Sequence, residues 1–255
     1  MKKLLLLIVI LLSVTNFLNA QSCATSAGWT TMASIPGATV GSPNYNTNPT
    51  SLRYSSFAFS IGNMGYIGGG MYPINGQLAT GATYWRSDFW EYNPSSNSWT
   101  QKADIINYYS VNVSNTYSAT TNNGGIIEAR GFSVGGKGYF IGGRTRNNSG
   151  GIIYSGYFQE YDPASNTWTD RASALSNACD LVYCKAPATF TINGVAYVGS
   201  AQTSGCSSNN NAVSNLSRKW YRFDQNTMSF SNIPDYPGTL QVNPVGFGGK
   251  NKGFL

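Results

Sequence analysis

The sequence predicts an all-β fold built from a repeated unit of four antiparallel strands. Two short patterns recur along the 255 residues. The first is a pair of aromatic and β-branched runs around a Gly/Asn-rich turn, as in FAFSIGNMGYIGGG (57–70) and RGFSVGGKGYFIGG (130–143). The second is an aromatic strand, a turn of Asn-Pro or Asp-Pro type, and a strand that opens with Trp or Phe. Both patterns are typical of β-hairpins.

The first pattern holds two columns of aromatic residues in register. These are Phe59, Phe132, Phe190 and Phe247 in one column, and Tyr66, Tyr139, Tyr197 and Phe254 in the other. Glycine in the turns between them supplies positive φ at no steric cost. A phosphate-binding loop is excluded, because Lys137 is followed by Gly138 rather than by Ser or Thr, and because no helix can follow. The glycines therefore indicate backbone geometry.

The second pattern follows each first hairpin. DFWEYNPSSNSWTQKAD (88–104) matches YFQEYDPASNTWTDRAS (157–173), and KWYRFDQNTMSFSNIPD (219–235) is a weaker third copy. Proline presets φ and pushes the preceding residue out of the helical region, so these steps initiate turns. One unit is thus two hairpins with strands a, b, c and d.

The predicted boundaries follow from these matches. We expect blades at about 53–105, 126–175 and 185–235, the start of a further one at 242–255, and a lone strand d at 29–36, where GWTTMASIP matches SWTQKADI.

Four residues mark each of the two best copies: a Gly-Gly pair closing strand b, then Tyr and Trp around the next turn. They are Gly69, Gly70, Tyr92 and Trp99, and Gly142, Gly143, Tyr161 and Trp168. The third copy departs from the pattern with Ser200-Ala201, Phe223 and Phe230. Over roughly residues 29–255, this arrangement resembles the Kelch repeat. The resemblance is to the Kelch repeats of secreted bacterial propellers of the galactose-oxidase-like kind. The resemblance implies a β-propeller in which these residues are structural.

The number of predicted strands is small for a propeller. The sequence supplies a lone strand, three blades and half of a fourth, whereas propellers close with about four to eight blades. We therefore expect the chain to be a fragment of a longer protein, and we expect the completed chain to be a monomer.

The N-terminus has the pattern of a secretory signal peptide over residues 1–20. Lys2 and Lys3 precede an apolar run that ends at Ala20, a lysine-led leader of bacterial type. This predicts a secreted, periplasmic or cell-surface protein. Past the leader, no segment is long and apolar enough to span a bilayer.

Charge and composition exclude several classes of function. The net charge of +6 falls to +4 without Lys2 and Lys3, and no basic stripe is present, so nucleic acid is not an expected partner. The chain has no histidine and its cysteine spacings do not fit zinc, so neither a metal nor another cofactor is expected.

The four cysteines, Cys23, Cys179, Cys184 and Cys206, lie beyond the leader and favour disulfides in an oxidising compartment. Cys179 and Cys184 fall in a d–a connection and Cys206 in a b–c loop, and both kinds of connection emerge at the same end of a blade. Cys206 is therefore expected to pair with Cys184, the preferred partner, or with Cys179. Cys23 is left to pair with Cys179 or with a residue beyond the sequence.

Because the b–c and d–a connections emerge at the same end of a blade, every long connection is expected at one end of the blades. Long loops on a rigid scaffold commonly carry binding residues. The candidates are Tyr84, Trp85, Tyr108, Tyr109, Arg144, Arg146, Tyr154 and Arg218. Such side chains suit stacking on sugar rings or contact with a protein, although they could also simply attach the loops to the scaffold.

These observations favour a non-enzymatic module that binds a glycan or an extracellular protein. The alternative is an enzyme resembling galactose oxidase, whose histidine ligands this chain lacks, or the bacterial sialic acid mutarotase. Acid–base candidates are limited to Glu128 and Asp180, without a visible partner, so no catalytic residue is assigned. A purely architectural module of a larger surface protein is the third hypothesis.

Overall fold

The computed structural model describes residues 31–36, 53–73, 83–106, 125–146, 152–154, 156–203, 215–249 and 251–255. The chain divides into two units, Met1–Met32 and Ala33–Leu255, and the elements below belong to the second. Within the described residues, no helix has the length and apolarity needed to cross a membrane.

The described residues contain three four-stranded antiparallel sheets, which we call the first, second and third blades. The first blade holds β1 (Phe57–Ile61), β2 (Met64–Gly68), β5 (Phe89–Asn93) and β6 (Ser98–Lys102). The second holds β7 (Arg130–Val134), β8 (Lys137–Ile141), β11 (Phe158–Asp162) and β12 (Thr167–Asp170). The third holds β14 (Ala188–Ile192), β15 (Val195–Gly199), β18 (Trp220–Asp224) and β19 (Ser229–Ile233). The predicted all-β fold of four-stranded blades is confirmed.

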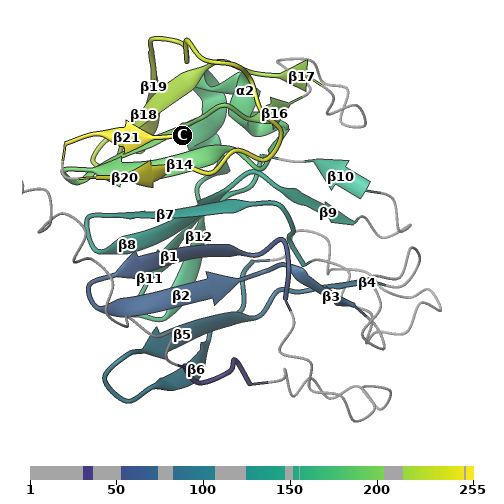
Figure 1. The fold of residues 1–255 in the computed structure, drawn as a ribbon, viewed down its shortest axis with the longest axis vertical. Helices are drawn as coiled ribbons and strands as arrows, with labels where there is room; N and C mark the ends of the chain where they lie inside the picture. Colours follow the sequence, from purple (N-terminus) through teal and green to yellow (C-terminus); the bar gives the residue numbers. More distant parts are fainter. Residues whose placement is uncertain are drawn as a thin grey trace, which may run out of the picture. The chain divides into compact units, whose positions relative to one another are not determined.

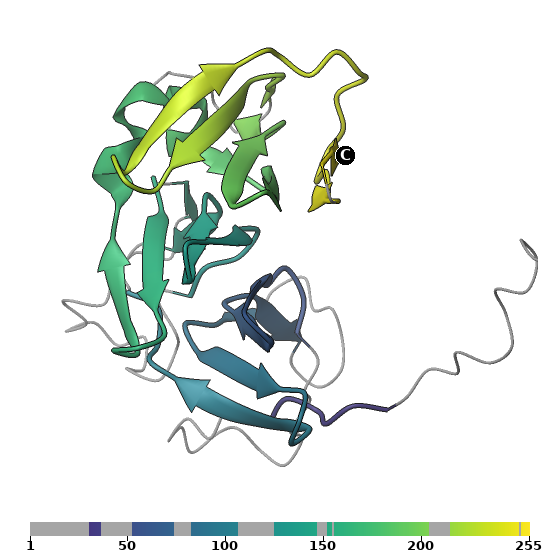
Figure 2. The same cartoon turned by 90° about the vertical axis from the view of Figure 1, so that its left-hand side faces the viewer.

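A hairpin of β20 (Phe247–Gly248) and β21 (Gly253–Phe254) follows the third blade. The inner strands β1, β7, β14 and β20 contact one another in that order, and they lie side by side in Figure 1. Figure 2 shows the blades following one another from blue through green to yellow as the chain proceeds. Sequence order is thus also spatial order.

The b–c loops, and the d–a connection that enters the third blade, contain short strands that the sequence analysis did not predict. They are β3 (Met71–Pro73) with β4 (Thr83–Trp85), β9 (Arg144–Arg146) with β10 (Ile152–Tyr154), and β16 (Gln202–Thr203) between β13 (Cys184–Lys185) and β17 (Asn215–Leu216). All extend from the same end of the blades in Figure 1, opposite the short a–b and c–d turns. We call this the loop end. The d–a connection before β13 also holds η2 (Ala172–Asn177) and α2 (Cys179–Val182).

At the opposite end, the c–d turns of the first and second blades tie each of these blades to the segment before it. Asn166 Oδ1 accepts from Ala103 N at 3.0 Å, and Trp168 Nε1 donates to Ala103 O at 2.9 Å. Asn97 and Trp99 hold Ala33 in the same way. Ala33 therefore lies where the end of a strand d would lie. Residues 31–36 pair with no described strand, so the lone strand at 29–36 stays a prediction.

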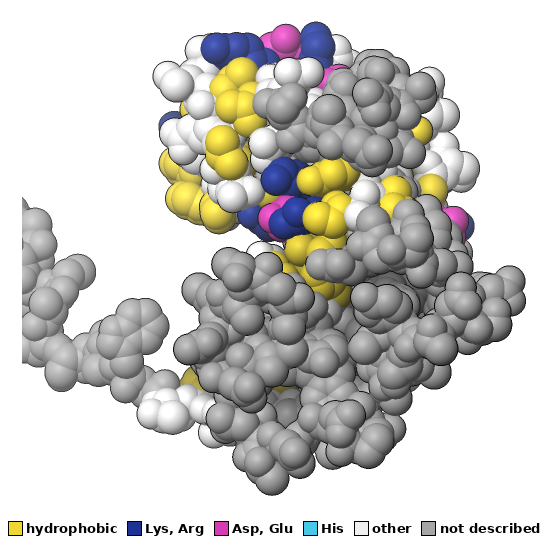
Figure 3. All heavy atoms as spheres, turned by 90° about the vertical axis from the view of Figure 1, so that its right-hand side faces the viewer, with side chains coloured by type: hydrophobic (Ala, Val, Ile, Leu, Met, Phe, Trp, Pro, Cys, Tyr) yellow, Lys and Arg dark blue, Asp and Glu magenta, His cyan; other side chains and the backbone are white. Residues whose placement is uncertain are grey.

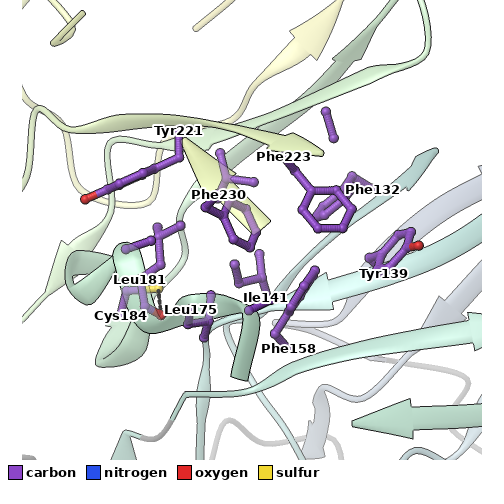
Figure 4. Packing of buried hydrophobic residues seen from close by; sticks show 14 of the residues in the cluster. Phe132, Tyr139, Ile141, Phe158, Leu175, Leu181, Cys184, Tyr221, Phe223 and Phe230 are labelled. Atoms are coloured by element: carbon purple, nitrogen blue, oxygen red, sulfur yellow. Dashed lines mark hydrogen bonds between the residues drawn. The ribbon is translucent and has the colours of Figure 1, made fainter. Parts of the chain in front are cut away.

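Aromatic side chains fill the spaces between blades. One cluster, which includes Phe57, Phe89, Tyr161 and Trp168, lies between the first and second blades. Another lies between the second and third blades, and Figure 4 shows Phe132, Tyr139, Phe158, Phe223 and Phe230 facing one another there. The third blade has Phe230 where the others have Trp, so it cannot donate a ring N–H and instead packs on Phe158. Phe132 and Tyr139 of the predicted aromatic columns thus pack between blades, whereas Phe247 and Phe254 are exposed.

Two of these buried tyrosines donate hydrogen bonds to glutamates. Tyr66 donates to Glu91 and Tyr139 to Glu160, both at 2.6 Å. Burial, and then the neighbouring carboxylate, raises the pKa of both phenols well above the ordinary value of 10.0. Burial also raises the pKa of Tyr161 to about 12. The folded state therefore favours the protonated phenols.

We predict that stability falls as the pH rises from about 10 toward 12. Because folding raises these pKa values, their contribution is complete below the unfolded-state value of 10.0 and is lost as the pH rises toward the folded-state values. Urea denaturation of the purified protein at successive pH values measures this loss. The Tyr66→Phe, Tyr139→Phe double variant should show a shallower decline. Equal stability of the wild type at pH 9 and pH 12 would contradict the buried pairs.

Candidate functional site

The Gly-Gly pairs join consecutive blades at the loop end. Gly70 N donates to Ile126 O at 2.7 Å, and Gly143 N donates to Cys184 O at 2.8 Å. Both glycines have positive φ, +84° and +96°, and a Cβ at Gly70 would lie 2.2 Å from Ser56 Oγ. Only glycine allows this conformation and this close approach. Each pair thus fixes the connection that leads into the next inner strand.

A second line of backbone hydrogen bonds runs beside the first. Glu128 N donates to Ser55 O at 3.0 Å, and Ala186 N donates to Glu128 O at 2.6 Å. Ser55, Glu128 and Ala186 each stand four positions before an aromatic residue of the inner strands, Phe59, Phe132 or Phe190. All three have a left-handed backbone, with φ of 58°, 59° and 47°. Such a conformation costs a non-glycine residue about 1–2 kcal/mol. The contacts between blades hold it in place.

The b–c loops complete the framework at the loop end. The first residue of each loop pairs with the residue just before the left-handed position: Tyr54 with Met71, Ile127 with Arg144, and Lys185 with Gln202. Each blade therefore presents two equivalent positions, occupied by Ser55 and Met71 in the first blade, by Glu128 and Arg144 in the second, and by Ala186 and Gln202 in the third. The second blade alone has charged residues at both.

Glu128 is the centre of a charged group that we call the Glu128 cluster: Glu128, Arg130, Arg144, Lys185 and Trp85. Arg144 Nη2 lies 2.9 Å from Glu128 Oε1, and Lys185 Nζ lies 3.8 Å from Oε2. The Arg144 guanidinium lies over the Trp85 ring at 5.9 Å from its centroid. Figure 3 looks onto the loop end and shows basic and acidic side chains gathered beside hydrophobic ones.

Several buried polar atoms near this cluster have no hydrogen-bond partner among the described residues. They are Glu128 Oε2, Arg144 Nε and Gln202 Oε1. The one other such atom is Nε of Arg171, whose guanidinium pairs with Glu160 at 2.9 Å. Buried polar groups are normally satisfied, so three in neighbouring positions of two blades indicate a place for a polar ligand.

Arg130 adds a partly desolvated cation from the start of β7. Burial lowers the pKa of its guanidinium, and the nearby Glu128 carboxylate acts in the opposite direction. Nη1 donates to Ala129 O at 3.2 Å. No group of three His, Cys, Asp or Glu side chains that could hold a metal ion is present in the described part of the chain.

The structure brings together two of the predicted binding residues, Trp85 and Arg144. Trp85 is only 4% exposed, so it supports Arg144 rather than offering a free stacking face. Tyr154 is half-buried on β10 opposite Arg144. Arg218 donates to the carbonyls of Tyr236 and Gly238 and so holds that segment.

The remaining candidates lie outside the described residues. These are Tyr108, Tyr109 and the side chains of Tyr84 and Arg146.

Arg130, Lys185 and Gln202 were missed by the sequence analysis. The sequence does distinguish Arg130. When the blades are aligned on Phe59, Phe132 and Phe190, Arg130 stands where the other blades have Phe57 and Ala188. A charge at a position that other blades fill with apolar residues is not required by the repeat.

The preferred disulfide partner was wrong. Cys184 is a free, fully buried thiol in the core between the second and third blades, where it donates to Leu181 O at 3.3 Å (Figure 4). Its side chain lies under Gly142, and burial raises its pKa far above the ordinary value. Cys179 is disulfide-bonded, and its partner is outside the described residues, as are Cys23 and Cys206.

Comparison with solved structures identifies the architecture. The structure of YjhT, a Kelch-type propeller, matches with a TM-score of 0.50 and 16% sequence identity, over 72% of this chain and 51% of that one. The fold is a Kelch-like β-propeller. The chain spans about half the length of YjhT, and at this identity the likeness concerns the fold alone. No protein-family model matches the sequence, and no curated protein matches it either.

We predict that the protein still folds when the charges of Glu128 and Arg144 are both removed. Glu128→Ser alone leaves the neighbouring cations unbalanced and should cost about 2 kcal/mol of unfolding free energy. Adding Arg144→Met recreates the Ser55/Met71 combination of the first blade and should restore stability to within about 1 kcal/mol. Chemical denaturation of both single variants and the double variant measures the coupling. Simple additivity of the two losses would show that the pair does not interact.

Proposed function

We propose that this chain is a secreted binding module that takes a glycan at the Glu128 cluster. The observation that carries the proposal is the set of unpartnered buried atoms, Glu128 Oε2, Arg144 Nε and Gln202 Oε1. They comprise acceptors and a donor within one framework. Sugar hydroxyls both donate and accept, so they suit such a mixed group.

The charged residues support a ligand site over a structural role. The first and third blades build the same backbone framework with Ser55 and Met71, or with Ala186 and Gln202. The fold therefore needs no ion pair here. The Glu128 carboxylate keeps one buried oxygen without a hydrogen bond among the described residues, which favours a ligand that donates to it.

A protein partner is less well supported at this end. Protein interfaces depend on exposed aromatic and aliphatic anchors. Among the described residues, the large exposed hydrophobic side chains are Met32, Ile106, Ile152, Val242, Val245, Phe247, Phe254 and Leu255. Of these, only Ile152 belongs to a b–c hairpin. The apolar anchors thus do not gather around the Glu128 cluster.

An enzymatic role would depend on Glu128 alone. The other acid–base candidate, Asp180, accepts a hydrogen bond from Tyr221 at 3.1 Å in the third blade. The two carboxylates therefore do not form a catalytic pair. Mutarotase-like proton transfer by Glu128 stays the alternative, and turnover of a bound sugar by the wild type would favour it over simple binding.

A glycan array screened with the secreted protein tests the proposal. The wild type should capture one group of glycans, and the Glu128→Ser, Arg144→Met double variant should bind them at least tenfold more weakly while remaining folded. Lys137→Met is a matched control, because it removes a cation whose ion pair with Asp162 lies at the opposite end. Full binding by the double variant, or capture of extracellular proteins but of no glycan, would overturn the proposal.

A further inference from the structure

The Glu128 cluster holds more positive charge than its carboxylate can balance. Among the described residues, the Glu128 carboxylate has three cationic neighbours, Arg130, Arg144 and Lys185. Arg144 occupies Oε1 at 2.9 Å, whereas Lys185 stays 3.8 Å from Oε2, beyond hydrogen-bond distance. One carboxylate thus leaves a surplus of two positive charges.

These cations are not freely hydrated. The Lys185 side chain is 18% exposed and that of Arg144 is 21% exposed. Arg130 is partly buried, and its Nη1 is directed to the Ala129 carbonyl. Bringing cations out of water without compensating anions is unfavourable, so a bound anion would stabilise this arrangement.

The repeat shows that neither Arg130 nor Lys185 is needed by the fold. The positions equivalent to Arg130 hold Phe57 and Ala188, and those equivalent to Lys185 hold Tyr54 and Ile127. Uncharged side chains therefore start the inner strand and precede the left-handed residue in the other blades. The two cations occur only in adjoining segments of the second and third blades.

The framework brings these two segments together. The hydrogen bond from Ala186 N to Glu128 O, at 2.6 Å, joins the residue after Lys185 to a residue two positions before Arg130. The strands that follow, β7 and β14, lie in contact, with Thr189 Oγ1 donating to Gly131 O at 2.9 Å. Arg130 and Lys185 thus come from opposite sides of one junction between blades.

We infer that Arg130 and Lys185 form an oxyanion subsite that takes the sulfate ester or carboxylate group of an acidic glycan. This inference rests on the proposed glycan binding at the Glu128 cluster and adds the charge class of the ligand. Guanidinium and ammonium groups both make charge-assisted hydrogen bonds to such oxygens. Glu128 and Gln202 are then left to accept from sugar hydroxyls.

Calorimetric titration with matched pairs of oligosaccharides tests the subsite. One pair is a sulfated galactan oligosaccharide and its desulfated form, and the other is an oligogalacturonate and its methyl ester. The wild type should bind the acidic member of one pair at least tenfold more tightly, and the pair that responds identifies sulfate or carboxylate. Arg130→Ala with Lys185→Ile, the residues of the neighbouring blades, should abolish the preference. Lys137→Ile, at the opposite end, should leave it unchanged.

The outcomes separate the subsite from glycan binding itself. Equal affinity for acidic and uncharged members in the wild type overturns the subsite but leaves the proposed function standing. Binding to neither member of either pair counts against these glycans, and inorganic sulfate then decides the subsite. Sulfate should raise the melting temperature of the wild type more than that of the Arg130→Ala, Lys185→Ile variant. An equal rise in both proteins overturns the subsite.

Discussion

Backbone hydrogen bonds between consecutive blades position the described framework residues at the loop end. The glycine of each Gly-Gly pair donates to the connection that enters the next blade, from Gly70 to Ile126 and from Gly143 to Cys184. A parallel line joins Ser55, Glu128 and Ala186. Because these bonds use main-chain atoms, side chains at the framework positions can vary without loss of the fold. The proposed binding residues are thus supported by a structure that does not depend on their identity.

This separation explains how a repeat produces a single site. The three blades share a left-handed residue and a bridge to the b–c loop, yet only the second places Glu128 and Arg144 there. Lys185 reaches the same carboxylate from the third blade, and Trp85 supports Arg144 from the first. The site therefore forms across two junctions between blades, and no single repeat contains it.

Much of the architecture could be predicted from the sequence, because hairpins and turns depend on local residue patterns. The Gly-Gly pairs, the aromatic columns and the parity that places all long loops at one end are local or periodic features. The same periodicity places Arg144 at the loop end. Contacts between blades were not predictable in this way. Trp85 was expected to be an open platform but is buried beneath Arg144, and Cys184 was expected in a disulfide but points into the core. The role of Glu128 depends on partners 16 and 57 residues away.

Amide hydrogen exchange measured by NMR tests the central claim most directly. If the framework between blades organises the loop end, the amides of Gly70, Gly143, Glu128 and Ala186 should exchange as slowly as those in the middle of β8 and β15. These amides lie in connections rather than in the blades, so this protection has no other source among the described residues. Exchange as fast as that of Gly194 in an exposed a–b turn would show that the blades are not joined in this way.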